Sequence, residues 1–486
     1  MPRTLDLVVK NVRIVRPNVR EVVQGDIGIA AGKFALLEKN IDVEEAKAVY
    51  DGKGLLAFPG VVDAHMHTGI YSPLAEDAVS ESRAAAQGGV TTSLNYFRSG
   101  QYYLNKGGPY AEFFPEVLKI SEGKFHVDYG FHLAPMDSTH VSEIENLIEQ
   151  FGVCSFKIFM FYGSHGLHGR SDSQRDFLMI GADERYDYAH FEFIMRGVQA
   201  ARERFPEKAG QISLSLHCET AEIMTAYTKM VEGRLEGLAG YHESRPPHSE
   251  GLAVFIASYL ANETELPNIN LLHLSSRKAL TAALQMAELF PHVDFRREVT
   301  IGHLVLDTNS KAGVLAKVNP PIRPREDVEF LWQKLLEGKV DWVVSDHACC
   351  RHETKAAKHA LGNIWLAKSG FGGTEYLLPA LLSEGAKRGL SLHRVAELTS
   401  YNPAKRFGAN AKGDIAPGLD ADLVLVDPQS SWTIRAAESE STQGYTPFEG
   451  LELGSKVKAT FLRGELICEN GKVVGAPRGR YLHRPT

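Results

Sequence analysis

Short apolar runs alternate with amphipathic stretches through the middle of this chain of 486 residues. Eight runs have the length and composition of buried strands: residues 61–65, 91–97, 127–132, 153–160, 212–217, 269–274, 295–301 and 342–346. Between them, apolar positions with helical spacing predict helices at 76–87, 190–204, 249–261, 277–289 and 325–336. Eight strand–helix units predict an α/β fold of the TIM (β/α)8 barrel type. The alternative, a doubly wound open sheet, favours a glycine-rich phosphate turn after its first strand, and HMHTG at 65–69 is no such turn.

Both ends of the chain show a different pattern, with a period of two and glycines at turns. The runs at 5–15, 26–29 and 34–37 predict strands near the start, and those at 421–426 and 456–462 near the end. Asn470-Gly471 suits a tight hairpin turn, because both residues tolerate positive φ. We therefore expect a small β-sandwich formed from both termini (1–57 and 413–486), with the barrel domain spanning 58–412.

The composition of the chain limits the kinds of partner that we expect. The formal net charge is −7, which argues against nucleic acid as the main partner. No run approaches ~18 consecutive apolar residues, and the N-terminus lacks a signal-peptide core, so we expect no membrane partner. Five scattered cysteines do not form a disulfide framework and predict a cytoplasmic protein.

Several predicted strands carry a polar, metal-ligating residue at or near their carboxyl ends. They are His65 and His67, Lys157, His217, His273 and Asp346. Because these strand ends meet on one face of a barrel, the six side chains can converge. Residues two apart on a strand point the same way, so His65 and His67 can reach one ion. Each residue alone has a structural alternative, a buried histidine or an aspartate cap, but the joint pattern favours a metal site.

Lys157 lies inside the apolar run FKIF at 156–159. One interpretation is a lysine whose head group extends out to water. The favoured one is burial with a lowered pKa, which leaves a neutral amine able to add carbon dioxide. The resulting carbamate is an anionic ligand with two oxygens, able to bridge two metal ions.

These motifs resemble those of the amidohydrolase superfamily, in particular its cyclic amidohydrolases: hydantoinase/dihydropyrimidinase, allantoinase and dihydroorotase. The resemblance covers nearly the whole chain. It rests on PGVVDAHMH (59–67), FKIFM (156–160), SRPP (244–247), VNPP (318–321), SDH (345–347), NPAK (402–405) and GDIAPG (413–418). It implies a TIM barrel with a terminal β-sandwich, and a binuclear site.

The resemblance also implies individual roles. His65 and His67 are the expected ligands of the more buried metal, His217 and His273 those of the second, and carboxylated Lys157 (N6-carboxylysine) the bridge. Asp346 is the expected last ligand and the general base and acid. A bridging hydroxide, generated by the two cations, would attack the amide carbonyl. Tyr162 is the expected oxyanion donor, and Asn319 and Ser369 are expected to contact the substrate.

The expected cofactors are two divalent ions, with zinc favoured over manganese, iron or nickel, and carbon dioxide for Lys157. The expected substrate is a small cyclic amide, imide or ureide of the hydantoin or dihydropyrimidine type, with allantoin next. The expected assembly is a homo-oligomer, a dimer or a tetramer.

The sequence departs from the family pattern in two places, and other functions are compatible with the same motifs. Thr68 and Gly69 stand where dihydroorotases place an aromatic residue and a carboxylate-binding arginine, which argues against dihydroorotate. The long segment after Lys157, with His165 and His168, is either an active-site lid or a surface elaboration. The rival functions are hydrolysis of an acyclic urea or amide, a less favoured deamination, and a non-catalytic assembly protein.

Overall fold

A computed structural model describes residues 5–162, 174–356 and 362–486. Its centre is an eight-stranded parallel sheet in sequential order. The strands are β6 (Val61–Met66), β7 (Val90–Arg98), β8 (Asp128–Ala134), β9 (Ser155–Phe159), β10 (Ser213–His217), β11 (Asn268–Leu271), β12 (Asp294–Thr300) and β13 (Trp342–Val344). A parallel bridge between Met66 and His347 brings the two edges together and nearly closes the barrel. The predicted barrel is confirmed, and its strands begin and end close to the predicted positions.

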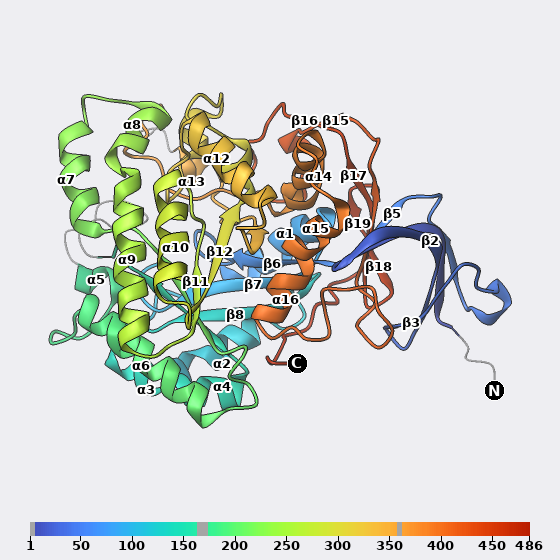
Figure 1. Cartoon of the computed structure of the whole chain (residues 1–486), viewed down its shortest axis with the longest axis horizontal. Coiled ribbons are helices and arrows are strands. Elements are labelled where there is room, and N and C mark those ends of the chain that lie inside the picture. Colours follow the sequence, from blue (N-terminus) through green and yellow to red (C-terminus); the bar gives the residue numbers. More distant parts are fainter. Residues whose placement is uncertain (1–4, 163–173, 357–361) are drawn as a thin grey trace.

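Helices surround this barrel (Figure 1). The longer ones are α1 (Leu74–Gln87), α2 (Tyr110–Ser121), α6 (Tyr188–Arg204), α7 (Ala221–Val231), α9 (Pro247–Glu263), α10 (Arg277–Leu289), α12 (Arg325–Leu336) and α14 (Leu377–Lys387). The shorter ones are α3 (Ser138–Ser142), α4 (Ile144–Phe151), α5 (Gln174–Leu178), α8 (Gly237–Ser244), α11 (Ile301–Val305), α13 (His352–Lys355), α15 (Leu392–Ala396) and α16 (Asn402–Arg406). Every residue of β6 to β11 is buried, as expected for strands covered on both faces. A polar side chain inside such a strand therefore cannot reach bulk water.

A nine-stranded sheet built from both ends of the chain lies beside the barrel (Figure 1). Its N-terminal strands are β1 (Leu7–Arg16), β2 (Val19–Ala30), β3 (Lys33–Glu38), β4 (Val49–Asp51) and β5 (Leu56–Pro59). Its C-terminal strands are β14 (Leu423–Asp427), β17 (Lys456–Leu462), β18 (Glu465–Glu469) and β19 (Lys472–Val473). Two further strands, β15 (Trp432–Thr433) and β16 (Glu452–Leu453), pair only with each other. The antiparallel pair β5–β14 joins the two contributions, and a shared apolar cluster that includes Val12, Leu423 and Phe461 packs against them.

Two smaller predictions are also confirmed. Asn470 and Gly471 both have positive φ (49° and 80°) at the β18–β19 hairpin turn. All five cysteines are free and buried. Among the described residues, the helices are too short or too polar to span a membrane.

Candidate metal centre

The six predicted metal-ligating side chains come together at the carboxyl ends of five barrel strands. His65 lies in β6, Lys157 in β9, and His217 ends β10. His67 follows β6, His273 follows β11, and Asp346 follows β13. Five of the six line one cavity: His67, Lys157, His217, His273 and Asp346. His273 and Asp346 have positive φ (32° and 55°), so the chain bends sharply where each strand gives way to its loop.

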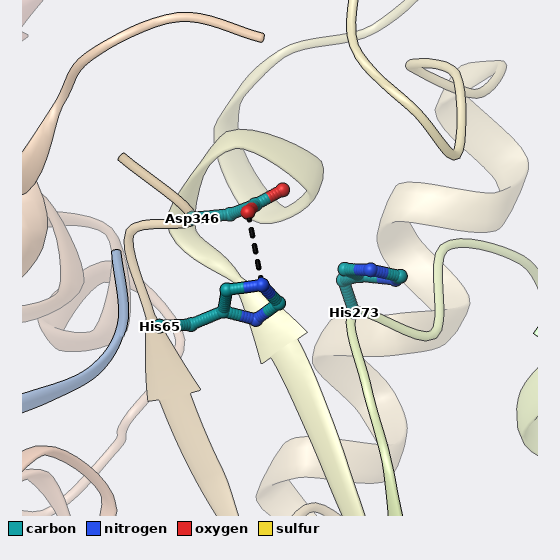
Figure 2. Close-up of side chains that lie close together, drawn as sticks. All are labelled: His65, His273 and Asp346. Atoms are coloured by element: carbon teal, nitrogen blue, oxygen red, sulfur yellow. Dashed lines mark ion pairs between the residues drawn. The ribbon is translucent and has the colours of Figure 1, made fainter. Parts of the chain in front are cut away.

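The ligating atoms are close enough to share metal ions. The Asp346 Oδ1 atom lies 3.1 Å from Nε2 of His65 and 3.3 Å from Nε2 of His67. One ligand atom each from His65, His273 and Asp346 lie within 4.8 Å of one another. Figure 2 shows the ion pair between His65 and Asp346, with His273 facing them.

The protonation of these groups also suits metal binding. Burial lowers the pKa of His65, His67 and His273 well below the usual histidine value, and the nearby Lys157 or His217 charge adds to this effect. Neutral imidazole is the form that binds a metal. The Nδ1 atom of His273 is buried and has no hydrogen-bond partner in the part of the chain that the structure describes. The donor set therefore fits divalent cations that accept nitrogen and oxygen ligands.

Lys157 is the most unusual member of the group. It is only 1% exposed, so its head group does not extend to water. Its Nζ lies 3.1 Å from Nε2 of His65 and over the rings of Tyr96 and Phe159, at 4.0 and 4.4 Å from their centroids. Burial lowers the Lys157 pKa to about 7, which makes the neutral amine accessible near neutral pH.

Two carboxylates that the sequence analysis missed orient the histidines. Oε1 of Glu298, in β12, lies 2.7 Å from Nδ1 of His65, which leaves the His65 Nε2 lone pair for a metal. Oε2 of Glu219 lies 2.7 Å from Nε2 of His217, which leaves Nδ1 of His217 for the same purpose. Burial raises the Glu219 pKa, but Arg245 and the bond to His217 outweigh it and bring the pKa to about 2. Burial raises the pKa of Glu298 to about 7.

A tyrosine orients a third histidine, His67, which lines the cavity. The Tyr103 hydroxyl lies 2.8 Å from Nδ1 of His67. Tyr103 has positive φ (53°) in the loop after β7, so no strand or helix periodicity could have revealed this contact. Glu298 carried no signal like that of Lys157, because it follows Arg296 and Arg297 in β12 (DFRREVT) and does not interrupt an apolar run.

The predicted substrate contacts fall into two groups. Asn319 and Ser369 line the same cavity as the metal-ligating residues. The Tyr241 hydroxyl donates to Oδ1 of Asn319 at 2.5 Å and lies 3.4 Å from Oγ of Ser369. Tyr162 is buried and does not line this cavity among the described residues, but its ring lies 4.8 Å from that of Phe159, which does. His165 and His168, in the segment expected to be either a lid or a surface elaboration, lie outside the described residues.

A parallel barrel with a buried histidine, lysine and aspartate cluster at its carboxyl ends defines a class, the metal-dependent barrel hydrolases. Sequence comparison identifies the family within this class. The Amidohydrolase family matches residues 272–472. Allantoinase of Salmonella choleraesuis is 32% identical, with 99% of each chain covered. Allantoinase of Rubrobacter xylanophilus is 33% identical, with 98% of this chain and 97% of that protein covered.

Solved structures agree with this assignment. The L-hydantoinase (dihydropyrimidinase) of Arthrobacter aurescens has a TM-score of 0.84 and 26% identity, covering 98% of this chain and 99% of its own. The dihydropyrimidinase of Brevibacillus agri, at 24% identity and a TM-score of 0.84, shares the fold, with 98% of each chain covered. The chain belongs to the amidohydrolase family, in its cyclic amidohydrolase branch. It is a hydrolase of carbon–nitrogen bonds in cyclic amides, and its family generally uses a binuclear metal site.

Proposed function

We propose that this protein opens the ring of a cyclic ureide, with allantoin the first substrate to test and hydantoins and dihydropyrimidines next. The observation that carries the proposal is the cluster of six predicted ligands. His67, Lys157, His217, His273 and Asp346 line one cavity, and His65 lies directly beside Asp346. The order of substrates follows from the comparisons, because the relatives of 32–33% identity that cover nearly the whole chain are allantoinases.

Two divalent cations, zinc first among the candidates, would be held by the four histidines, Asp346 and carboxylated Lys157. When bound, they supply Lewis-acid polarisation of the ring carbonyl and a lowered pKa for water. Carboxylation requires the neutral amine, whose nitrogen attacks carbon dioxide and releases one proton. Burial supports this step because it brings the Lys157 pKa to about 7. The carbamate then also removes a buried ammonium, which is costly without an opposite charge.

Side chains of the protein carry out proton transfer, oxyanion stabilisation and substrate binding. Asp346 accepts a proton from the attacking water and passes it to the ring nitrogen as the carbon–nitrogen bond breaks. The water oxygen stays on the carbonyl carbon, so the product is an open-chain ureido acid. Tyr162 donates to the oxyanion that forms on the carbonyl, where a preorganised donor has its largest effect. Asn319 and Ser369 hold the ring amide.

The test is product formation by metal-loaded protein with allantoin, hydantoin, dihydrouracil, dihydroorotate and an acyclic aryl urea, each repeated with Lys157→Ala. We expect turnover of a ring ureide that is lost in the variant. Activity on the acyclic urea alone would contradict ring opening while leaving the metal site in place. Lys412→Met is the matched control, because Lys412 is also buried but pairs with Asp128 and Asp422 at the opposite end of the barrel.

We also propose that the protein forms a homo-oligomer in the cytoplasm. Large apolar side chains are exposed on neighbouring helices, including Phe193 on α6 and Phe255 and Tyr259 on α9. Exposed apolar patches of this kind are typical of protein contacts. Light scattering of the purified chain tests this, and a monomer at micromolar concentration would contradict it.

A further inference from the structure

Arg98, the last residue of β7, is a buried cation that has no acidic partner in the described part of the chain. It is 1% exposed. Its Nη1 atom donates to the carbonyl oxygens of Ser99 (2.8 Å) and Gln101 (3.0 Å). Within residues 5–162, 174–356 and 362–486, no carboxylate lies within 4.0 Å of its guanidinium. A buried charge is costly when nothing opposes it, so the position calls for a functional explanation.

The guanidinium is held in a cage of aromatic rings close to the cavity. Its carbon lies 4.9 Å from the ring centroid of Phe177, 5.2 Å from that of Tyr162 and 5.6 Å from that of Tyr103. Tyr103 contacts His67, and Tyr162 packs against Phe159, and both His67 and Phe159 line the cavity. Arg98 therefore lies one layer of side chains away from the reacting groups.

One hydrogen bond links Arg98 directly to the Tyr162 hydroxyl group. Nε of Arg98 lies 3.1 Å from the Tyr162 hydroxyl oxygen. A guanidinium can only donate, so the tyrosine oxygen accepts in this bond, and the bond does not use the phenolic proton. A hydroxyl that accepts a charge-assisted bond is polarised and becomes a stronger donor itself.

We propose that Arg98 is a positioning residue that fixes the Tyr162 hydroxyl and strengthens its donation to the oxyanion of ring opening. This inference rests on the proposed function. As negative charge develops on the substrate carbonyl, the Tyr162 proton moves toward that oxygen. The positive charge of Arg98 then offsets the negative charge that gathers on the phenol oxygen. Arg98 itself does not touch the substrate.

A merely structural role is the competing explanation, since Arg98 also joins β7 to its loop through two carbonyl oxygens. The two explanations differ in how Arg98 depends on Tyr162. If Arg98 acts through the hydroxyl, its removal matters only while the hydroxyl is present. If it only supports the loop, its removal matters equally with or without that hydroxyl.

The experiment is a double-mutant cycle of Arg98→Gln and Tyr162→Phe, measured as kcat and KM on the ring substrate that the wild-type protein turns over. Removing one donor to an oxyanion lowers kcat by about 10²–10³-fold. We expect Tyr162→Phe to fall in that range. We expect Arg98→Gln to lower kcat at least about tenfold with KM changed less than about threefold, and to have an effect below about threefold in the Tyr162→Phe background.

Two further variants keep the cycle decisive. Arg98→Met removes both the charge and the Nε donor while keeping an unbranched side chain, and it replaces Arg98→Gln in the cycle if the latter does not fold. Phe177→Leu removes one ring of the cage but no hydrogen bond, so kcat should stay within about threefold of wild type. Equal factors for the Arg98 substitution in both backgrounds would overturn the inference while leaving ring opening intact. A wild-type protein that opens no cyclic ureide would overturn the proposed function and this inference together.

Discussion

Replacing Glu298 by glutamine changes one atom of a buried carboxylate that organises the metal centre. Oε1 of Glu298 accepts from the His273 backbone N–H (3.1 Å) and lies 2.7 Å from Nδ1 of His65. Oε2 accepts from the Trp342 indole N–H at 2.9 Å. Glutamine has a single side-chain oxygen. If that oxygen accepts from His65 and His273, the NH2 group of Glu298→Gln faces the Trp342 indole N–H, and two donors then face each other.

Two effects follow, and their sizes can be stated. Loss of the indole bond leaves a buried donor without a partner, which costs about 1–3 kcal/mol of folding free energy. His65 then bonds to a neutral amide instead of a carboxylate. Loss of such an outer partner weakens metal binding about 10–100-fold, which corresponds to about 1.4–2.7 kcal/mol. Both effects should appear in one variant that keeps all six metal-ligating side chains.

The assay is chelator competition for metal affinity, with thermal unfolding measured on the same samples. Asp128→Asn is the matched control. Asp128 is a buried carboxylate at the start of β8, paired with Lys412 at the opposite end of the barrel. It should lower the unfolding temperature without changing metal affinity. If the metal affinity of the Glu298→Gln variant is within about twofold of the wild-type affinity, the reasoning is refuted.

Three further predictions follow from the same contacts. Metal affinity should fall as the pH drops through about 7, because Lys157 and Glu298 both have pKa values near 7 and take up protons there; chelator titrations from pH 8 to 6 that show constant affinity would contradict this. Burial raises the Glu81 pKa, but the bond to His347 and its neighbours lower it to about 2. Stability from Glu81 is thus present above the unfolded pKa near 4.5 and lost as the pH falls toward 2, up to about 3 kcal/mol. Glu81→Gln should flatten this acid limb of the unfolding curve, and an unchanged limb would count against the assignment. Asn319→Asp replaces the amide donor by a carboxylate beside Tyr241 and should raise KM at least about tenfold with a smaller effect on kcat; steady-state kinetics with the larger change in kcat would argue against a binding role.

The sequence was informative wherever a polar residue interrupts an apolar run. Lys157 and His217 stood out in this way, and the helix at 277–289 was predicted with the bounds of α10. Regular strands and helices have a periodicity, and burial of whole strands makes each polar exception visible. Glu298 lacked this signature, because two arginines precede it in β12, and a carboxylate on a strand does not reveal that its partner is a histidine from β6.

Contacts made by residues in or beside loops could not be predicted from the sequence. Tyr103 reaches His67 from a left-handed position in an irregular loop, so its contact depends on tertiary packing alone. The bond from Arg98 to Tyr162 joins residues 64 positions apart, and no local pattern relates them. Such orienting contacts are fixed by the way the barrel closes, after the strands have been placed.

The most direct test of the central claim is a count of metal ions and of the Lys157 carbamate in one preparation. The protein would be grown with ¹³C-labelled bicarbonate, its metals measured per chain, and its carbamate detected by ¹³C NMR, for wild type and Lys157→Ala. The account predicts two divalent ions and one labelled carbamate per chain in the wild type, with the carbamate absent and metal content reduced in the variant. Two tightly bound ions in a wild-type protein that carries no carbamate, or undiminished metal in Lys157→Ala, would contradict it.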